Sequence, residues 1–252
     1  MNQEASARRA AFRQLHESGH FIIPNPWDIG GVRRLEKWGF KALASTSAGA
    51  AWALGKQDGE LSLTEALEHL RLLCAATDLP VNADFEAGFA DSPEGVAANV
   101  ALAVDTGVAG VSIEDWSGEQ IYPLSLAVER IAAARAAIDA SGQDVLLVGR
   151  SEGFRIHKAP IAETIARLTA YSAAGADVLY APWVVDVDEV AAIVAAVAPK
   201  PLNVLLHHPG VQVGELAAVG VRRFSVGARL ASYAWAAFEA AAISVRDEGH
   251  LP

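Results

Sequence analysis

The sequence is poor in cysteine, in basic residues and in long apolar runs, and each shortage excludes a class of protein. The single cysteine, Cys74, cannot form an internal disulfide, so a reducing cytoplasm is the expected setting. There are 20 basic against 30 acidic residues, and the formal net charge of −10 argues against a nucleic-acid or anionic-membrane partner. No run of about 18 apolar residues predicts a membrane span. Arg8, Arg9 and Arg13 are followed by no apolar core of a signal peptide.

Short apolar segments are what the sequence has in abundance, with 52% hydrophobic residues among 252. Eight of them alternate with eight predicted helices, after one extra helix at 2–18. Such alternation predicts parallel βα units, and eight units predict a closed (β/α)8 TIM barrel. Without a linker or composition break, we expect one domain over 1–252. The strands are expected within 20–27, 42–45, 80–89, 110–116, 144–150, 178–183, 201–206 and 222–227. The helices that follow them are expected at 29–38, 64–76, 93–106, 124–140, 160–173, 187–197, 213–219 and 228–246.

The segment 80–89 ends in two acids spaced by one residue, Asp84 and Glu86. Side chains alternate along a strand, so these two would point the same way, roughly 7 Å apart at their Cα atoms. Two carboxylates on one face repel each other unless a cation, a proton or an arginine offsets the repulsion. A hard divalent metal such as Mg²⁺ is the simplest solution, because it takes oxygen ligands and is often held by one or two carboxylates.

Other polar residues fall at the ends of the expected strands, where α/β barrels place their sites. Three acids and one arginine from adjacent strands would meet at one mouth. Buried carboxylates are costly unless paired or metal-bound, so we interpret the set as a site rather than as separate salt bridges or caps. Asp58, in a glycine-containing loop, is either a turn residue or a site acid. The residues at the strand ends are Thr46, Ser47, Asp84, Glu86, Ser112, Glu114, Arg150, Glu152 and Asn203.

Several other residues have more ordinary interpretations. His207 and His208 would face opposite sides of a strand, so polar loop residues are favoured over a metal pair. Cys74 lies in an apolar helix and is expected to be a core thiol. Trp183 either forms a pocket wall or covers the barrel rim. Gly227-Ala228-Arg229 resembles a barrel phosphate site, but no second glycine-rich loop accompanies it.

The order and spacing of these motifs resemble the isocitrate lyase and phosphoenolpyruvate mutase superfamily along nearly the whole chain. The most informative segment is Asp-Phe-Glu-Ala-Gly-Phe at 84–89. The matching segments lie at 25–28, 46–49, 54–59, 84–89, 110–115, 148–150, 175–177, 201–204 and 220–227.

The resemblance implies a Mg²⁺-dependent enzyme, with Mn²⁺ as the alternative, that acts on a 2-oxo acid or enolpyruvyl compound. The reaction implied is that of a lyase or decarboxylase on a small 2-oxo or 2-hydroxy (di)carboxylate, through a metal-stabilised enolate. The implied metal ligands are Asp84, Glu86 and Glu114. The implied substrate-binding residues are Thr46, Ser47, Ala48, Asp84, Arg150 and Asn203. The implied catalytic residues are Arg150, Asp58 and Glu114.

The resemblance also implies an assembly. Members of the superfamily form homotetramers, built as dimers of dimers whose C-terminal helices are exchanged. An aromatic stripe in the last expected helix fits such a contact, although ordinary packing would also explain it. Its members are Tyr233, Trp235 and Phe238.

The loop at 116–123 departs from the superfamily. It reads Trp-Ser-Gly-Glu-Gln-Ile-Tyr-Pro and lacks both the Lys-Lys-Cys-Gly-His segment of the lyases and the Lys-x-Asn pattern of the mutases. Pro182 stands where the mutases have a histidine. An acid/base would have to come from Ser117, Glu119 or Tyr122. The alternatives are therefore a C–P phosphonomutase or phosphonopyruvate hydrolase, and a non-catalytic barrel that binds 2-oxo acids.

Overall fold

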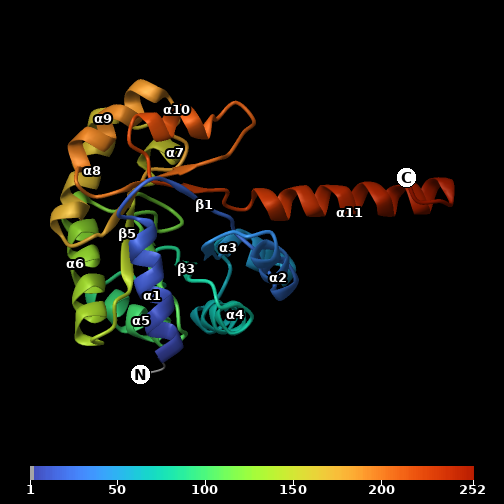
Figure 1. Ribbon diagram of the computed structural model, residues 1–252, viewed down its shortest axis with the longest axis horizontal. Coiled ribbons are helices and arrows are strands. Elements are labelled where there is room, and N and C mark those ends of the chain that lie inside the picture. Colours follow the sequence, from blue (N-terminus) through green and yellow to red (C-terminus); the bar gives the residue numbers. More distant parts are fainter. Residues whose placement is uncertain (1–2) are drawn as a thin grey trace.

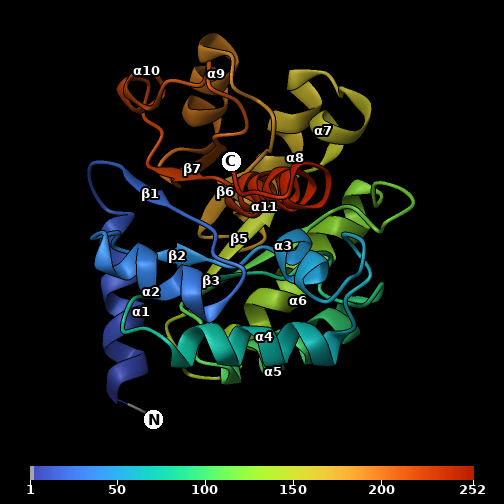
Figure 2. The same ribbon diagram turned by 90° about the vertical axis from the view of Figure 1, so that its right-hand side faces the viewer.

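The computed structural model describes residues 3–252 and contains an eight-stranded parallel barrel surrounded by helices (Figures 1 and 2). The strands are hydrogen-bonded in the order β1-β8-β7-β6-β5-β4-β3-β2. The ring is nearly closed, because the Ala44 amide of β2 donates to the carbonyl of Pro24, just after β1, at 3.0 Å. The predicted barrel is therefore confirmed. Its strands are β1 (Phe21–Ile23), β2 (Leu43–Ala44), β3 (Val81–Asp84), β4 (Gly110–Glu114), β5 (Leu146–Arg150), β6 (Val178–Tyr180), β7 (Leu202–Leu205) and β8 (Arg223–Ser225).

The helices follow the predicted alternation with two additions, α3 and α7. Both are short helices in segments that were expected to be loops, at the ends of β2 and β5. Among residues 3–252, no helix is long and apolar enough to cross a bilayer. The helices are α1 (Gln3–Leu15), α2 (Ile29–Lys37), α3 (Ser47–Ala53), α4 (Leu63–Ala75), α5 (Pro93–Asp105), α6 (Leu124–Ala140), α7 (Gly153–His157), α8 (Ile161–Ala173), α9 (Val187–Val197), α10 (Val213–Ala218) and α11 (Arg229–Glu248).

Local sequence explains where the outer helices start. Ser62 and Glu65 form a capping box at α4, in which each side chain satisfies a backbone amide of the first turn. Ser92 caps α5 and is followed by Pro93, which needs no amide partner at the first helical position. Gly107 ends the same helix with φ +96°, a conformation that glycine adopts without a Cβ clash.

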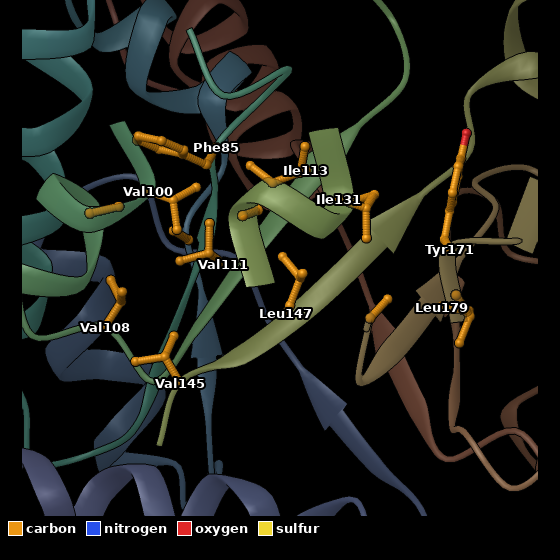
Figure 3. Close-up of a cluster of buried hydrophobic side chains, with 14 of the residues drawn as sticks. Phe85, Val100, Val108, Val111, Ile113, Ile131, Val145, Leu147, Tyr171 and Leu179 are labelled. Carbon is orange, nitrogen blue, oxygen red and sulfur yellow. The ribbon is translucent and has the colours of Figure 1, made fainter. Parts of the chain in front are cut away.

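The main core lies between the outer face of the sheet and the helices (Figure 3). Val111 and Leu147, from neighbouring strands, are fully buried there beside Val100 of α5 and Ile131 of α6. Each such side chain adds about 1.5–3 kcal/mol of hydrophobic stabilisation. Cys74 belongs to this core, as predicted, and burial raises the pKa of its thiol to about 11.

The inside of the barrel is closed at the end opposite the site by α1. Phe12 of this helix and His16, which follows its last residue, pack edge-on against Phe21, with ring centroids 6.5 and 4.9 Å from it. The guanidinium of Arg223 lies 5.9 Å from the Phe12 ring and donates to Asn82 Oδ1 at 3.3 Å. A second, partly polar core thus fills the barrel beneath its mouth.

The buried His16 should make the protein less stable in mild acid. Burial, and then the charge of Arg223, lower its pKa to about 3 from about 6.5. Between those values the unfolded chain binds a proton that the folded chain does not, so stability falls as pH drops from about 6.5 toward 3. From pH 7 to pH 5 the loss from this residue should be about 2 kcal/mol.

Urea denaturation at pH 7 and pH 5 would measure this loss, with His16→Leu as the test variant. Between pH 7 and pH 5, the free energy of unfolding of the variant should fall by about 2 kcal/mol less than that of the wild type. Exposed His250→Leu serves as the matched control. Equal pH dependence of the wild type and His16→Leu would contradict the prediction.

Helix α11 leaves the barrel body and projects away from it, carrying the C-terminus to the far end of the molecule (Figure 1). Within the described chain, Ala231 is the sole fully buried residue of this 20-residue helix. Tyr233 and Phe238 are 66% and 63% exposed. Most of the surface of these two side chains is therefore not covered by their own barrel, whereas Trp235 is 36% exposed and lines a hollow with Trp52. The exchange between subunits stays a prediction.

Candidate active site

The ends of β3, β4 and β5 bring Asp84, Glu114 and Arg150 together, as the strand-end argument predicted. Glu114 and Arg150 are register partners on adjacent strands. Arg150 Nη1 lies 3.2 Å from Asp84 Oδ1 and 3.2 Å from Glu114 Oε2. Burial alone would lower the pKa of Arg150, but the surrounding carboxylates, Glu114 foremost, raise it well above its usual value. Burial raises the pKa of Glu114, an effect that Arg150 opposes.

Glu86 reaches the same site by a different geometry from the one expected. Strand β3 ends at Asp84, and Glu86 lies in the following turn with φ +47°. The same-face alternation argument therefore does not apply to this pair. Its Oε1 is buried and has no hydrogen-bond partner among residues 3–252. Burial, followed by the charges of Asp84 and Asp58, raises the pKa of Glu86 to about 7.

The unexpected helix α3 places the first substrate-binding candidates against these acids. Ser47 donates to Asp84 Oδ2 from both its amide and its hydroxyl, at 3.0 and 3.2 Å. The same hydroxyl lies 3.3 Å from Asp58 Oδ1, so Asp58 is brought into the site. Burial and the charge of Asp84 raise the pKa of Asp58. Thr46 caps the helix by accepting from the amide of Gly49 at 3.3 Å.

Arg155 is a site residue that the sequence reasoning missed. It lies on α7, three residues after Glu152, and both Arg155 Nε and Arg150 Nε donate to the Glu152 carboxylate. Glu152 is fully buried, and its amide donates to Asp115 Oδ1 at 2.7 Å. The i, i+3 spacing of an acid and an arginine would have been a usable signal had α7 been predicted.

Two adjoining cavities open at this mouth and share Ser47, Asp58, Arg150 and Arg155. The acidic cavity, about 200 Å³, is also lined by Glu86 and Glu114. The basic cavity, about 240 Å³, also contains Asp84 and extends past Trp183 to His207 and Arg229. Thr46 and Ala48 line the basic cavity as well. Larger hollows of about 560 and 690 Å³ lie elsewhere, the first beside α1 and the second between α2, α3 and α4, and none of these acids and arginines lines either of them.

Asn203 lies lower in the barrel and lines neither cavity. It is 1% exposed, and its Nδ2 donates to Ser225 Oγ at 3.0 Å. Its register partners are Tyr180 and Arg223. Its neighbour Tyr180 does line the basic cavity, as does Leu205, two residues further along β7.

The site's charges suit a cation. Five carboxyl groups meet two guanidinium groups here, namely Asp58, Asp84, Glu86, Glu114 and Glu152 against Arg150 and Arg155. Over residues 3–252, no three acidic, histidine or cysteine side chains already converge as a metal cage. The Arg150 guanidinium lies between Asp84 and Glu114 instead. The buried oxygen of Glu86 that lacks a partner is the type of ligand that Mg²⁺ takes, commonly with water completing its shell.

The loop after β4 is stabilised by hydrogen bonds between its own residues. Trp116 and Ile121 form an isolated antiparallel bridge, and the Ser117 hydroxyl donates to the Gln120 carbonyl at 3.0 Å. Ser117 lines the acidic cavity, whereas Glu119 is exposed and lines neither cavity. Tyr122 is buried and donates to Asp91. Of the three acid/base candidates in this loop, Ser117 alone reaches a cavity.

The chain is similar to known proteins over most of its length. The family model described as phosphoenolpyruvate phosphomutase matches residues 12–246. The uncharacterized protein Rv1998c of Mycobacterium tuberculosis is 32% identical over 244 residues, covering 96% of this chain and 91% of the relative. An oxaloacetate decarboxylase of Bradyrhizobium sp. is 32% identical over 202 residues, covering 75% and 68%.

Solved structures are similar over almost the whole chain. A Burkholderia cenocepacia J2315 protein, described only as a lyase/mutase, has a TM-score of 0.95 and 45% identity, covering 99% of this chain and 91% of that one. Oxaloacetate acetylhydrolase in complex with its product oxalate has a TM-score of 0.88 and 27% identity, covering 99% and 89%.

Proposed function

The chain belongs to the isocitrate lyase/phosphoenolpyruvate mutase superfamily, and from that membership we propose that it is a Mg²⁺-dependent carbon–carbon lyase or decarboxylase. Its substrate would be a small 2-oxo or 2-hydroxy dicarboxylate. Relatives named oxaloacetate decarboxylase and 2-methylisocitrate lyase support this class. The observation that carries the proposal is the convergence of Arg150 with Asp84 and Glu114, next to the buried Glu86 oxygen that lacks a partner.

The chain's own residues divide the work of binding and charge stabilisation. Asp84, Glu86 and Glu114 would hold the divalent ion, which when bound supplies Lewis acidity at the substrate's oxo oxygen. Arg150 is fixed in advance by Glu152, so its positive charge is in place where negative charge develops as the bond breaks. Such a preorganised donor is worth about 2.7–4 kcal/mol in other enzymes.

Two residues of the β2–α4 region would handle orientation and the proton. The amide and hydroxyl of Ser47 are donors at the boundary of the two cavities, suited to a substrate carboxylate. Asp58 accepts from that hydroxyl, and its raised pKa suits it to hold a proton beside the reacting carbon. Thr46 and Ala48 complete the wall on this side.

An assay panel tests this function. Oxaloacetate, methylisocitrate and phosphonopyruvate would be incubated with Mg²⁺, with EDTA, and with EDTA followed by excess Mg²⁺. We expect release of carbon dioxide or of a 2-oxo acid from one of the carbon substrates, lost with EDTA and restored by the metal. Phosphate or phosphoenolpyruvate formed from phosphonopyruvate would favour the C–P alternative instead. Tight Mg²⁺-dependent binding without turnover would favour the binding barrel. Turnover unaffected by EDTA would refute the metal-dependent mechanism.

The proposed assembly is a homotetramer in the cytoplasm, a dimer of dimers that exchange α11. The exposed aromatic side chains Tyr233 and Phe238 support it, because a projecting helix with so little buried surface gains most of its stability from a partner. Sedimentation of the wild type and of Phe238→Asp would distinguish a tetramer from a monomer.

A further inference from the structure

Cationic side chains gather at the end of the basic cavity that lies away from the acids. Arg229, the first residue of α11, and His207, just after β7, both line it. The His207 ring stacks on Trp183, with centroids 4.7 Å apart and planes at 26°. Lys158 Nζ lies 5.4 Å from the centroid of the same tryptophan ring. Three elements that are distant in sequence therefore bring their basic groups to one place.

Arg229 and Lys158 have no counter-ion in the part of the chain that the structure describes. Within residues 3–252, no carboxylate oxygen lies within 4.0 Å of a side-chain nitrogen of Arg229, Lys158 or His207. In contrast, Arg150 and Arg155 both pair with Glu152. The acids that line this cavity, Asp58 and Asp84, lie against Ser47 at its border with the acidic cavity. Burial, and then the charges of His208, Arg229 and Lys158, lower the pKa of His207. An anion placed there would offset the repulsion between Arg229 and Lys158 and could accept a hydrogen bond from the neutral His207 ring.

Helix stability does not explain Arg229. The first turn of a helix has a partial positive charge, so a cation there is unfavourable by about 0.3–1 kcal/mol. The first turn of α11 contains no acidic residue that would compensate. Arg229 therefore gains nothing from its place in the helix, and the space that it lines is the basic cavity.

We propose that Arg229 and His207, with Lys158 beside them, form a second anion subsite that takes the far carboxylate of a substrate whose 2-oxo acid end lies at Arg150. This inference rests on the proposed function and deepens it, because it assigns the residues that would recognise the far carboxylate of the dicarboxylate. The two ends are then recognised by separate groups. Arg150 and Ser47 face the reacting end, and the basic cluster of Arg229, His207 and Lys158 faces the other.

Calorimetric binding of matched acids in the presence of Mg²⁺ tests the subsite. The pairs are oxaloacetate with 2-oxobutyrate, 2-oxoglutarate with 2-oxovalerate, and 2-oxoadipate with 2-oxohexanoate, so each pair has a similar chain length with and without the far carboxylate. In at least one pair the wild type should bind the dicarboxylate about 10- to 100-fold more tightly, as expected for charge-assisted hydrogen bonds.

Arg229→Gln should reduce that preference to within about threefold and leave the affinity for the monocarboxylate unchanged. His207→Asn should reduce it partly, which provides a second variant at the same subsite. Arg246→Gln is the matched control, since Arg246 lies in the last turn of the same helix and pairs with Asp247. Inorganic phosphate as competitor distinguishes a free-anion site from a substrate subsite, because only a free-anion site would bind phosphate as tightly as it binds the dicarboxylate.

The outcomes separate the subsite from the proposed function. Equal affinity for both members of every pair, tight phosphate binding, or an Arg229→Gln effect equal on both members would overturn the subsite. A dicarboxylate preference that is removed by Arg229→Gln but does not require Mg²⁺ would overturn the metal-dependent function and leave the subsite standing. Binding of neither class would overturn both.

Discussion

Asp84→Asn should abolish Mg²⁺-dependent binding of 2-oxo acids, with a loss of affinity of at least about 100-fold. Removing residues that only support metal ligands typically costs 10–100-fold, and a proposed ligand should cost more. Asparagine has nearly the same shape as aspartate but no charge. In place of one carboxylate oxygen it has an NH₂ group, which cannot accept a hydrogen bond from Ser47 or Arg150. Titration calorimetry with Mg²⁺, and then with oxaloacetate or oxalate, measures the effect.

The fold should survive this replacement. Arg150 keeps Glu114 and Glu152 as partners when the charge on Asp84 is removed, so the thermal midpoint should change little. Asp139→Asn on α6 is the matched control, because that aspartate is exposed and, among residues 3–252, its carboxylate pairs with Arg135 alone. If Asp84→Asn bound Mg²⁺ and 2-oxo acids as tightly as the wild type does, the assignment of the metal site to these acids would be wrong.

Arg130→Met should lower the free energy of unfolding by about 3–5 kcal/mol. Arg130 is 1% exposed and donates to the carbonyls of Ala87, Ala90 and Asp91, and its guanidinium lies 4.1 Å from the Tyr122 ring centroid. Methionine fills much of the volume but leaves all three carbonyls without their donor. Urea denaturation followed by circular dichroism measures the loss.

The same variant should also weaken metal binding, because these carbonyls belong to the loop that begins at Glu86. Arg130→Lys should recover only part of the stability, since a single ammonium cannot reproduce the fork of a guanidinium. Arg71→Met, at a half-exposed arginine on α4 that pairs with Glu68, should cost less than about 1 kcal/mol. A loss below that level for Arg130→Met would show that the loop does not depend on Arg130.

The sequence predicted the strands well because each is a short apolar run between a helix and a polar end. It did not predict α3 or α7. The segment of α3 reads Ser-Ala-Gly-Ala-Ala-Trp-Ala, which has small residues on every side and therefore no apolar stripe. Helix α7 has only five residues, fewer than two turns, so no periodicity can show in it.

The sequence predicted which residues form the site better than it predicted how they are arranged. Asp84, Glu114 and Arg150 meet because strand register brings neighbouring strand ends together, and register follows from the βα alternation. The position of Glu86 depends on a left-handed backbone angle, which alternation along a strand cannot supply. Asn203 was placed among the strand-end residues, but it lies in the buried layer below the cavities, because β7 runs on to Leu205 before it ends.

The self-contained turn after β4 bears on how a carbanion formed at this site would obtain its proton. The Trp116–Ile121 bridge and the Ser117 hydrogen bonds already order this turn, so ligand binding would cost it little further conformational entropy. Gly118, Glu119 and Gln120 are exposed to solvent. Water can therefore reach the acidic cavity past Gly118, which lines it. A carbanion bound in the cavity would take its proton on the face that the donor reaches, and the proposed donor, Asp58, lines one side of the cavity. Because water enters, the proton on Asp58 exchanges with solvent. In deuterated water a substituted product would then carry its deuterium on a single face, and its handedness would identify the side from which Asp58 acts.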